Sequence, residues 1–352
     1  MRTTQFSILD RSRTREGHPP AAALRDTVEL ARWAERLGYH RFWVAEHHSV
    51  PGVAGSAPTV LAAAVASATT AIRVGTGGVM LPNHRPLVVA EQFGVLASLF
   101  PGRIDMGLGR SVGFTGGIRR ALGTEKDAAE DFEAQLVELL GYFTGTQTAH
   151  PQVHARPAEG LTVPAFVLAT GAGARVAARA GLALVIGDFR APAKLLAAIE
   201  EYRATFRPSG LWARPYVVIS GTVAVAGTAE AARRLLVPEA RALAYSRTHG
   251  VFPPLRPAVD ASGGAASAAP VEPVLAPGAA GEGMSERERG FYADALRGHV
   301  HGTEEQVAQE LGTLIERSAA DEVLVTTSSY DRAALLESFE RLARLTGLAG
   351  RG

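Results

Sequence analysis

Short apolar runs alternate with longer segments of helical spacing along most of the chain. The apolar runs predict strands. These strands lie at residues 5–9, 41–45, 72–81, 103–109, 163–169, 183–187, 216–225 and 321–327. Apolar positions at helical spacing predict a helix after most of them. These helices lie at residues 24–37, 58–70, 86–99, 127–143, 174–180, 192–206, 229–247 and 332–345.

Strands that alternate with helices in this way predict one α/β domain over residues 1–352, a (β/α)8 TIM barrel with insertions at its C-terminal mouth. A doubly wound parallel sheet stays open, because it has the same alternation and the same right-handed crossovers. Residues 253–283 interrupt the rhythm with Pro, Ala, Gly and Ser. Such a segment buries little apolar surface, so we expect a flexible loop there. It is either a surface insertion or an active-site lid.

Composition narrows the class of protein. Hydrophobic residues make up 47% and charged residues 20%, which predicts a sizeable core. The net charge of +1 does not favour a nucleic-acid partner. The absence of cysteine excludes disulfides, thiolate nucleophiles and cysteine-ligated metals. The chain shows neither a signal segment nor a run of membrane-spanning length, so we expect a cytoplasmic protein without a membrane partner.

The stretch "AEHH" at residues 45–48 ends the second predicted strand. Side chains at a barrel mouth collect where strands end. His47 and His48 are neighbours on an extended chain and point to opposite sides, so we do not expect them to share a metal ion. A histidine at the barrel mouth suits proton transfer or a hydrogen bond to a cofactor, and Glu46 suits the task of orienting it or of pairing with a barrel cation. The alternative is a polar rim without catalytic function.

Three further strand ends are rich in glycine: "GTGGVMLPN" at 75–83, "GLGR" at 107–110 and "ATGAGAR" at 169–175. Gly77 and Gly78 lie inside a strand, where they indicate either a bulge with tight packing or the close approach of a flat ligand. Arg110 ends the second stretch and suits a phosphate. The third stretch precedes a helix, whose N-terminus favours an anion. Its candidate phosphate-binding residues are Ala169, Thr170, Gly171, Ala172, Gly173 and Arg175.

The same third stretch also has features of a dinucleotide fingerprint. Gly171-x-Gly173 follows a strand, and Asp188 ends the next one. This alternative predicts an NAD(P)-dependent dehydrogenase of the Rossmann type. Val176 occupies the position of the third glycine, which weakens it.

Taken in this order, the four stretches resemble the bacterial luciferase-like flavin monooxygenase family. The similarity is closest over residues 37–110 and continues more loosely through 167–187 and 321–343. It is greatest to a subgroup of single-component homologues found in actinobacterial biosynthetic clusters. The resemblance therefore covers most of the chain.

The resemblance implies a TIM barrel that binds reduced FMN at its C-terminal mouth. It places the catalytically important histidine at His47 and a non-prolyl cis peptide under the flavin at Gly77–Gly78. It assigns the flavin phosphate to Arg110 and to the loop at residues 169–175. The family often has serines in that loop, whereas this chain has Ala172, Gly173 and Ala174. Thr170, backbone amides and Arg175 are left to hold the phosphate.

The chemistry implied by the resemblance is a reaction of FMNH2 with O2 at the flavin C4a position. A separate NAD(P)H:flavin reductase would supply FMNH2, and the C4a-peroxyflavin would oxidise a small organic substrate. We expect that substrate to be a secondary-metabolite intermediate, or an aldehyde or ketone. The family also implies a homodimer. Two alternatives share the fold: a hydride-transferring enzyme that uses the deazaflavin F420, and a flavin-binding protein without catalytic activity.

Overall fold

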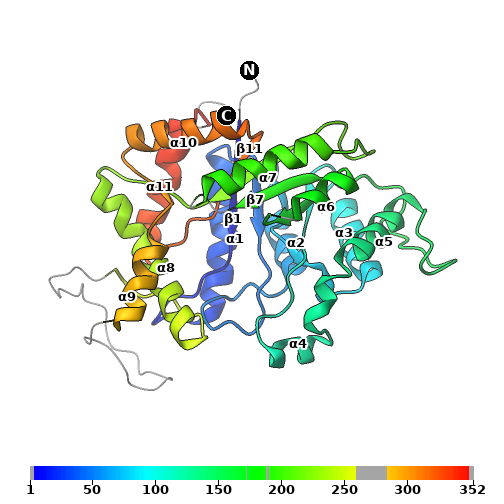
Figure 1. Cartoon of the computed structure of the whole chain (residues 1–352), viewed down its shortest axis with the longest axis horizontal. Helices are drawn as coiled ribbons and strands as arrows, with labels where there is room; N and C mark the ends of the chain where they lie inside the picture. The colour runs from blue at the N-terminus through cyan, green and yellow to red at the C-terminus, as the bar shows by residue number, and fades with distance from the viewer. Residues whose placement is uncertain (1–3, 172, 188, 190, 259–283, 349–352) are drawn as a thin grey trace.

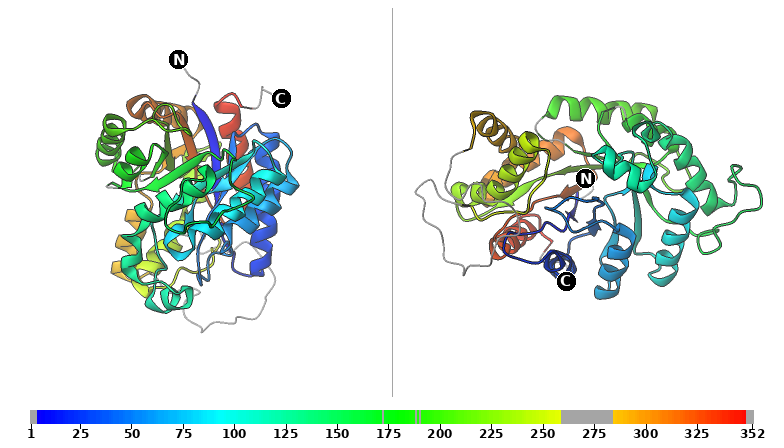
Figure 2. Two further views of the ribbon diagram at one scale, coloured as in Figure 1. Left: turned by 90° about the vertical axis from the view of Figure 1, so that its right-hand side faces the viewer. Right: turned by 90° about the horizontal axis from the view of Figure 1, so that it is seen from below.

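The computed structural model describes residues 4–171, 173–187, 189, 191–258 and 284–348. Its central feature is a closed barrel of parallel strands surrounded by a ring of helices (Figures 1 and 2). The barrel strands are β1 (Gln5–Asp10), β2 (Arg41–Val44), β3 (Arg73–Thr76), β5 (Ile104–Gly109), β6 (Ala165–Ala169), β7 (Ala183–Gly187), β8 (Val217–Gly221) and β11 (Glu322–Val325). Pairing between β3 and β5 closes the ring. The predicted TIM barrel is confirmed, and the doubly wound sheet is wrong.

The helices cover the outside of the barrel (Figure 2). They are α1 (Pro20–Arg36), α2 (Pro58–Ala68), α3 (Pro86–Leu99), α5 (Phe132–Thr144), α6 (Gly173–Ala180), α7 (Pro192–Thr205), α8 (Ala229–His249), α10 (Glu304–Ser318) and α11 (Arg332–Leu345). Several begin with proline, whose fixed φ and missing N–H suit the first turn. Two short helices, α4 (Gly116–Leu122) and α9 (Glu286–Ala295), interrupt the simple alternation.

Several predicted elements need correction. The strand predicted at 72–81 divides into β3 and β4 (Val79–Met80), because the peptide between Gly77 and Gly78 interrupts the ladder. The strand predicted at 216–225 divides into β8 and β9 (Val223–Val225), because β9 leaves the barrel to pair with β10 (Val300–Gly302). The helix predicted at 127–143 divides into the 3-10 helix η2 (Lys126–Ala129) and α5. Its first turn has hydrogen bonds between residues i and i+3, as in a 3-10 helix, rather than between i and i+4.

Residues 284–320 hold two helices that were not predicted. In α10 the apolar signal was present, because Val307, Leu311, Leu314 and Ile315 recur at helical spacing. A second signal marks the start of both helices: Ser285 with Glu288 opens α9 and Thr303 with Gln306 opens α10, and both pairs form complete capping boxes.

A buried ion-pair network fills the end of the barrel at which the strands begin. Nη1 of Arg41 on β2 lies 2.6 Å from Oδ2 of Asp105 on β5, and its Nε lies 3.0 Å from Oε2 of Glu322 on β11. Nη2 of Arg73 lies 2.6 Å from the other oxygen of Asp105, and Ser7 on β1 donates a hydrogen bond to Glu322. Both carboxylates are fully buried. The charges of Asp105 and Glu322 outweigh burial and raise the pKa of Arg41. The network joins five strands, β1, β2, β3, β5 and β11, and so helps to fix their register.

The predicted loop at residues 253–283 is described only as far as residue 258, and the rest lies outside the described residues. Its first part packs on the barrel mouth. Leu255 is fully buried, and its backbone exchanges hydrogen bonds with Thr14 and Glu16. Leu255 is thus one apolar residue of this segment that is buried, and it pairs with Arg15 in the loop after β1.

Candidate active site at the barrel mouth

Glu46 joins three segments at the end of β2. Its carboxylate is buried, with 4% of the residue exposed. Oε1 accepts hydrogen bonds from Nε2 of His48 at 2.6 Å and from Nε2 of His84 at 2.8 Å. Oε2 accepts one from the backbone N–H of Met80 at 2.8 Å. Burial alone would raise the pKa of Glu46, but these hydrogen bonds, led by that of His84, lower it, so the group is a carboxylate. Glu46 therefore holds β4 and two histidines against the end of β2.

Glu46, His48 and His84 also place three candidate metal-ligand atoms within 4.8 Å of one another. The sequence-based argument against a metal considered the adjacent histidines and missed His84, which is 38 residues from Glu46. Both imidazoles are already accounted for as donors to one carboxylate oxygen, and the other oxygen is occupied by a backbone amide. Hydrogen bonding therefore explains this cluster without a metal ion.

His47 belongs to a different environment from His48, as the alternation along the chain predicts. Its backbone N–H donates to the carbonyl of Gly55 at 2.9 Å. Its Nδ1 is buried, and no described residue bonds to it. Burial, together with the positive charges of Arg11 and Arg13, lowers the pKa of His47 to about 4. The imidazole is therefore neutral at neutral pH, and it offers a hydrogen bond rather than a positive charge.

The peptide bond between Gly77 and Gly78 is cis, as the resemblance implies. A Cβ on Gly78 would lie 2.7 Å from the backbone carbonyl oxygen of Gly107, whereas one on Gly77 would lie 2.6 Å from Cδ1 of Leu9, the far end of a side chain that can shift. Packing therefore requires glycine at position 78, which agrees with one of the two interpretations of the sequence. The described atoms leave the ligand interpretation untested.

The candidate phosphate residues differ in their environments. Arg110 follows β5, is exposed, and forms no hydrogen bond or ion pair with the part of the chain that the structure describes. Thr170 and Gly171 are exposed after β6, and Gly171 has a φ of +52°, which suits glycine. Arg175 instead forms an ion pair with Glu201 on α7, so the structure does not favour it as a phosphate ligand. Ala172 lies outside the described residues.

The remaining phosphate-loop residues, Ala169 and Gly173, lie at the junction of β6 and α6. A Cβ on Gly173 would lie 2.8 Å from Cβ of Ala169, so the strand and helix approach each other closely here. Because this junction belongs to a closed barrel, it does not provide the doubly wound sheet that the Rossmann alternative needs. Asp188, the acidic residue of that alternative, lies outside the described residues.

A cavity of about 310 Å³ lies at the mouth beside α8 and α9. Its size falls at the lower end of the range for small-molecule sites. Its polar lining residues include several at strand ends: Arg11, Ser220, Thr222, Thr326 and Ser328, with Glu239 of α8 and His299 beside them. Its apolar lining residues are Phe189, Leu236, Ala240, Leu243, Phe252 and Ala295. Sequence reasoning missed this cavity, because its residues come from segments that lie far apart in the chain.

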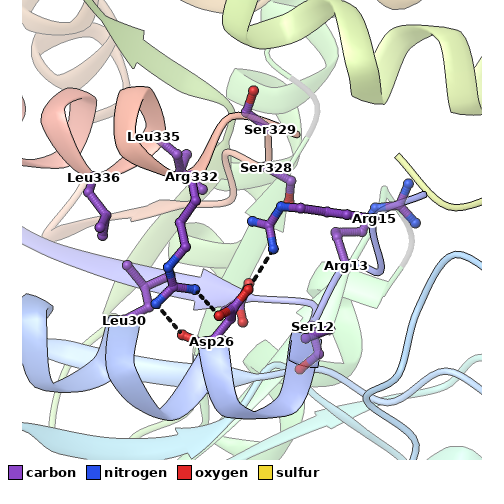
Figure 3. Close-up of a pocket in the computed structure, with 12 residues that line it drawn as sticks. Ser12, Arg13, Arg15, Asp26, Leu30, Ser328, Ser329, Arg332, Leu335 and Leu336 are labelled. Carbon is purple, nitrogen blue, oxygen red and sulfur yellow. Dashed lines mark hydrogen bonds and ion pairs between the residues drawn. The ribbon is translucent and has the colours of Figure 1, made fainter. Parts of the chain in front are cut away.

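A second and much smaller cavity, of about 20 Å³, lies between the loop after β1 and helices α1 and α11 (Figure 3). Asp26 on α1 dominates it, with ion pairs to Arg15 at 2.7 Å and to Arg332 at 2.8 Å. Its volume suits about one water molecule rather than a substrate. These ion pairs tie the loop after β1 to two helices and so help to hold Arg11 and Arg13 in place.

Comparison with known proteins decides the family. The sequence profile described as luciferase-like monooxygenase matches residues 4–322. The chain belongs to the luciferase-like monooxygenase family. A luciferase-like monooxygenase of Escherichia coli (strain K12) is 33% identical over 343 residues, which are 96% of each chain. The crystal structure of apo-MsnO8 is 31% identical, covers 98% of this chain and 99% of that chain, and superposes with a TM-score of 0.81.

Two more distant structures share the fold of this luciferase-like monooxygenase. The oxygenating constituent of 3,6-diketocamphane monooxygenase from Pseudomonas putida, in complex with FMN, is 18% identical, covers 100% of this chain and 99% of its own, and has a TM-score of 0.69. An F420-dependent secondary alcohol dehydrogenase is 16% identical, covers 98% and 99%, and has the same TM-score. The predicted enzyme class, a monooxygenase, is confirmed by the family. None of the described helices has the length and apolar character needed to cross a bilayer.

Proposed function

We propose that this luciferase-like monooxygenase uses FMNH2 and O2 to oxidise a small organic substrate, a secondary-metabolite intermediate or an aldehyde or ketone. The observation that carries the proposal is the buried Nδ1 atom of His47, to which no described residue bonds. His47 lies at a strand end in the mouth of this family's barrel. A buried polar atom without a partner is costly unless a ligand satisfies it. A flavin or a flavin-bound substrate at the mouth is such a ligand.

The residues present fit an FMN cofactor. Arg110 is an exposed guanidinium without a described partner, and Thr170 and Gly171 present a hydroxyl and an open backbone at a neighbouring strand end. These groups would hold the phosphate. The side-chain-free peptide at Gly77–Gly78 would face the flavin ring. When bound, reduced FMN supplies the electrons for O2 activation.

His47 would act on a proton at its Nδ1. The neutral imidazole can accept a hydrogen bond from the substrate or cofactor, or donate one in its other tautomer. The low pKa makes a positively charged proton donor unfavourable at this position. Glu46 would act indirectly, because its hydrogen bonds to His48, His84 and Met80 fix the segments on both sides of the site.

Reducing equivalents would arrive from outside the chain. The Gly171-x-Gly173 stretch belongs to the barrel, so it does not supply a Rossmann-type NAD(P) site. We therefore propose that a separate NAD(P)H:flavin reductase delivers FMNH2.

We also propose a homodimer formed through α2 and α3. These neighbouring helices expose four large apolar residues, namely Val60, Val88, Val95 and Leu99. Val60 is 69% exposed and Leu99 is 65% exposed. Exposed large apolar residues gathered on neighbouring helices are typical of an interface. In light scattering, Val60→Asp with Leu99→Asp should give a monomer, and a wild-type monomer at micromolar concentration would refute the proposal.

The central test is oxygen consumption with FMNH2 generated by a reductase, in the presence of candidate aldehydes and ketones. Substrate-dependent oxygen uptake with product formation supports the proposal. Reduction of F420 by a secondary alcohol, without oxygen uptake, would favour the deazaflavin alternative. Tight flavin binding without turnover of any substrate would favour a non-catalytic role. The His47→Ala variant should lose turnover while it retains flavin binding, and full turnover in this variant would contradict the role of His47.

The cofactor site is tested by flavin titration of Arg110→Ala. Loss of a charge-assisted bond should weaken FMN binding by roughly ten- to hundredfold. A matched control is Arg297→Ala, which removes an exposed arginine that pairs with Asp294 near α9. Unchanged affinity in Arg110→Ala would refute the phosphate assignment.

A further inference from the structure

The large cavity at the barrel mouth is lined by both polar and apolar groups. Arg11 lines it together with the hydroxyl residues Ser220, Thr222 and Ser328 at strand ends. Helix α8 contributes Glu239 and otherwise apolar residues, and Ala295 of α9 and the rings of Phe189 and Phe252 add further apolar surface. A ligand that fills this space therefore has a polar head near the strand ends and an apolar body against the helices.

Charge decides which polar head fits. Nη1 of Arg11 lies 3.0 Å from Oε1 of Glu239, and Nε of Arg13 lies 3.1 Å from Oε2. Burial would raise the pKa of Glu239, but the charges of Arg11 and Arg13 lower it, so Glu239 is ionised. Two guanidinium groups thus share one carboxylate, both of whose oxygens are already occupied. The cluster carries one positive charge in excess.

The donors of this cluster also exceed its acceptors. Nη2 of Arg11 donates to the carbonyl of Thr326 at 3.0 Å and to Oγ of Ser328 at 3.3 Å, while its Nε has no described partner. Nη2 of Arg13 likewise has no described partner. An additional carboxylate would balance both the charge and the donors, whereas an ammonium group would meet the excess positive charge.

Other charged groups near Arg11 do not cancel this excess. Asp10 lines the small cavity between α1 and α11, and Thr27 donates a hydrogen bond to it. Burial raises the pKa of Asp10 and so disfavours its negative charge. Nearby His47 is neutral at neutral pH.

We propose that this cavity binds a substrate with an anionic carboxylate head and an apolar body, with Arg11 as the residue that selects the head. The inference rests on the proposed function, because it names the substrate class of that proposed monooxygenase. Arg13 supports the site indirectly, through two residues that line the cavity. It pairs with Glu239, and its guanidinium lies 4.2 Å from the centroid of the Phe252 ring.

The test is calorimetric titration of the whole protein with octanoate, octan-1-ol and octylamine, without flavin or reductant. These probes share an apolar chain and differ in head charge. Octanoate should bind at least about tenfold more tightly than octan-1-ol, because a hydrogen bond to a charged group gains that much, and octylamine should bind most weakly. Equal binding of octanoate and octan-1-ol, strongest binding of octylamine, or no binding of any probe would overturn the proposal.

Two variants test whether Arg11 is the residue that determines the preference for octanoate. Arg11→Gln should reduce octanoate affinity to about that of octan-1-ol and leave octan-1-ol within about twofold, and a retained octanoate preference would overturn the role of Arg11. Arg297→Gln, which removes an exposed arginine outside the cavity, should change neither. If Arg11→Gln does not fold, the comparison of probes on the wild-type protein still decides. These titrations do not involve oxygen, so their failure leaves the monooxygenase proposal standing, and failure of oxygen uptake leaves the binding result standing.

Discussion

Acidification should destabilise this enzyme through one identifiable histidine. His47 has a pKa of about 4 in the folded state, against 6.5 for an unperturbed histidine. Because the folded-state pKa is the lower one, neutral His47 contributes stability above pH 6.5, and this contribution is lost as the pH falls from 6.5 toward 4. The free energy of unfolding should fall by about 2 kcal/mol between pH 7 and pH 5 and by about 3 kcal/mol by pH 4 from this group alone.

The assay is urea denaturation of the wild type and of His47→Gln at several pH values. The difference between the two proteins isolates His47, because the other titrating groups are common to both. The variant should lose less stability on acidification, and an NMR titration should place the His47 pKa well below 6. Parallel pH dependence in both proteins, or a His47 pKa near 6.5, would refute the reasoning.

Three further predictions concern packing and the positions of side chains. Asp105→Asn should destabilise the protein by about 3–5 kcal/mol in urea denaturation, because it leaves the buried Arg41 without one of its carboxylates; a loss below about 1 kcal/mol would contradict a buried ion pair. Gly221→Ala should displace the Phe189 ring, since a Cβ would lie 2.2 Å from it; an unchanged ring position in a crystal structure would contradict this. Glu46→Gln should cost about 1–3 kcal/mol, because an amide N–H₂ in place of Oε2 cannot accept the bond from Met80; urea denaturation measures the loss, and unchanged stability would show that the bond contributes little.

The fold was predictable because most barrel strands contain a short apolar run, such as those of β6 and β7. The ends of these runs also located Glu46, His47 and the Gly77–Gly78 pair. Periodicity could not reveal partners that meet only when the ring closes. His84 follows η1 (Leu81–Asn83), and its imidazole has no sequence signal that ties it to Glu46. Arg11 and Glu239 are more than two hundred residues apart and become a pair only at the mouth.

Arg175 has a partner in the structure that its sequence context did not indicate. An arginine at the start of a helix after a glycine-rich turn suits a phosphate by type and position. The side chain nevertheless pairs with Glu201 on the neighbouring helix α7. Local sequence fixes where a side chain starts, whereas the acceptor that it reaches depends on how the helices pack together.

The buried network at the closed end of the barrel has a consequence for biosynthesis. Arg41 and Glu322 are 281 residues apart, so at roughly 5–20 residues per second a ribosome needs roughly 15–55 seconds to make the second after the first. During that time β1 lacks β11, and so does β8 once it has been made; β11 pairs with both, so each leaves an open sheet edge prone to aggregation. Nascent chains halted before residue 322 should therefore bind chaperones strongly, and completed chains should release them.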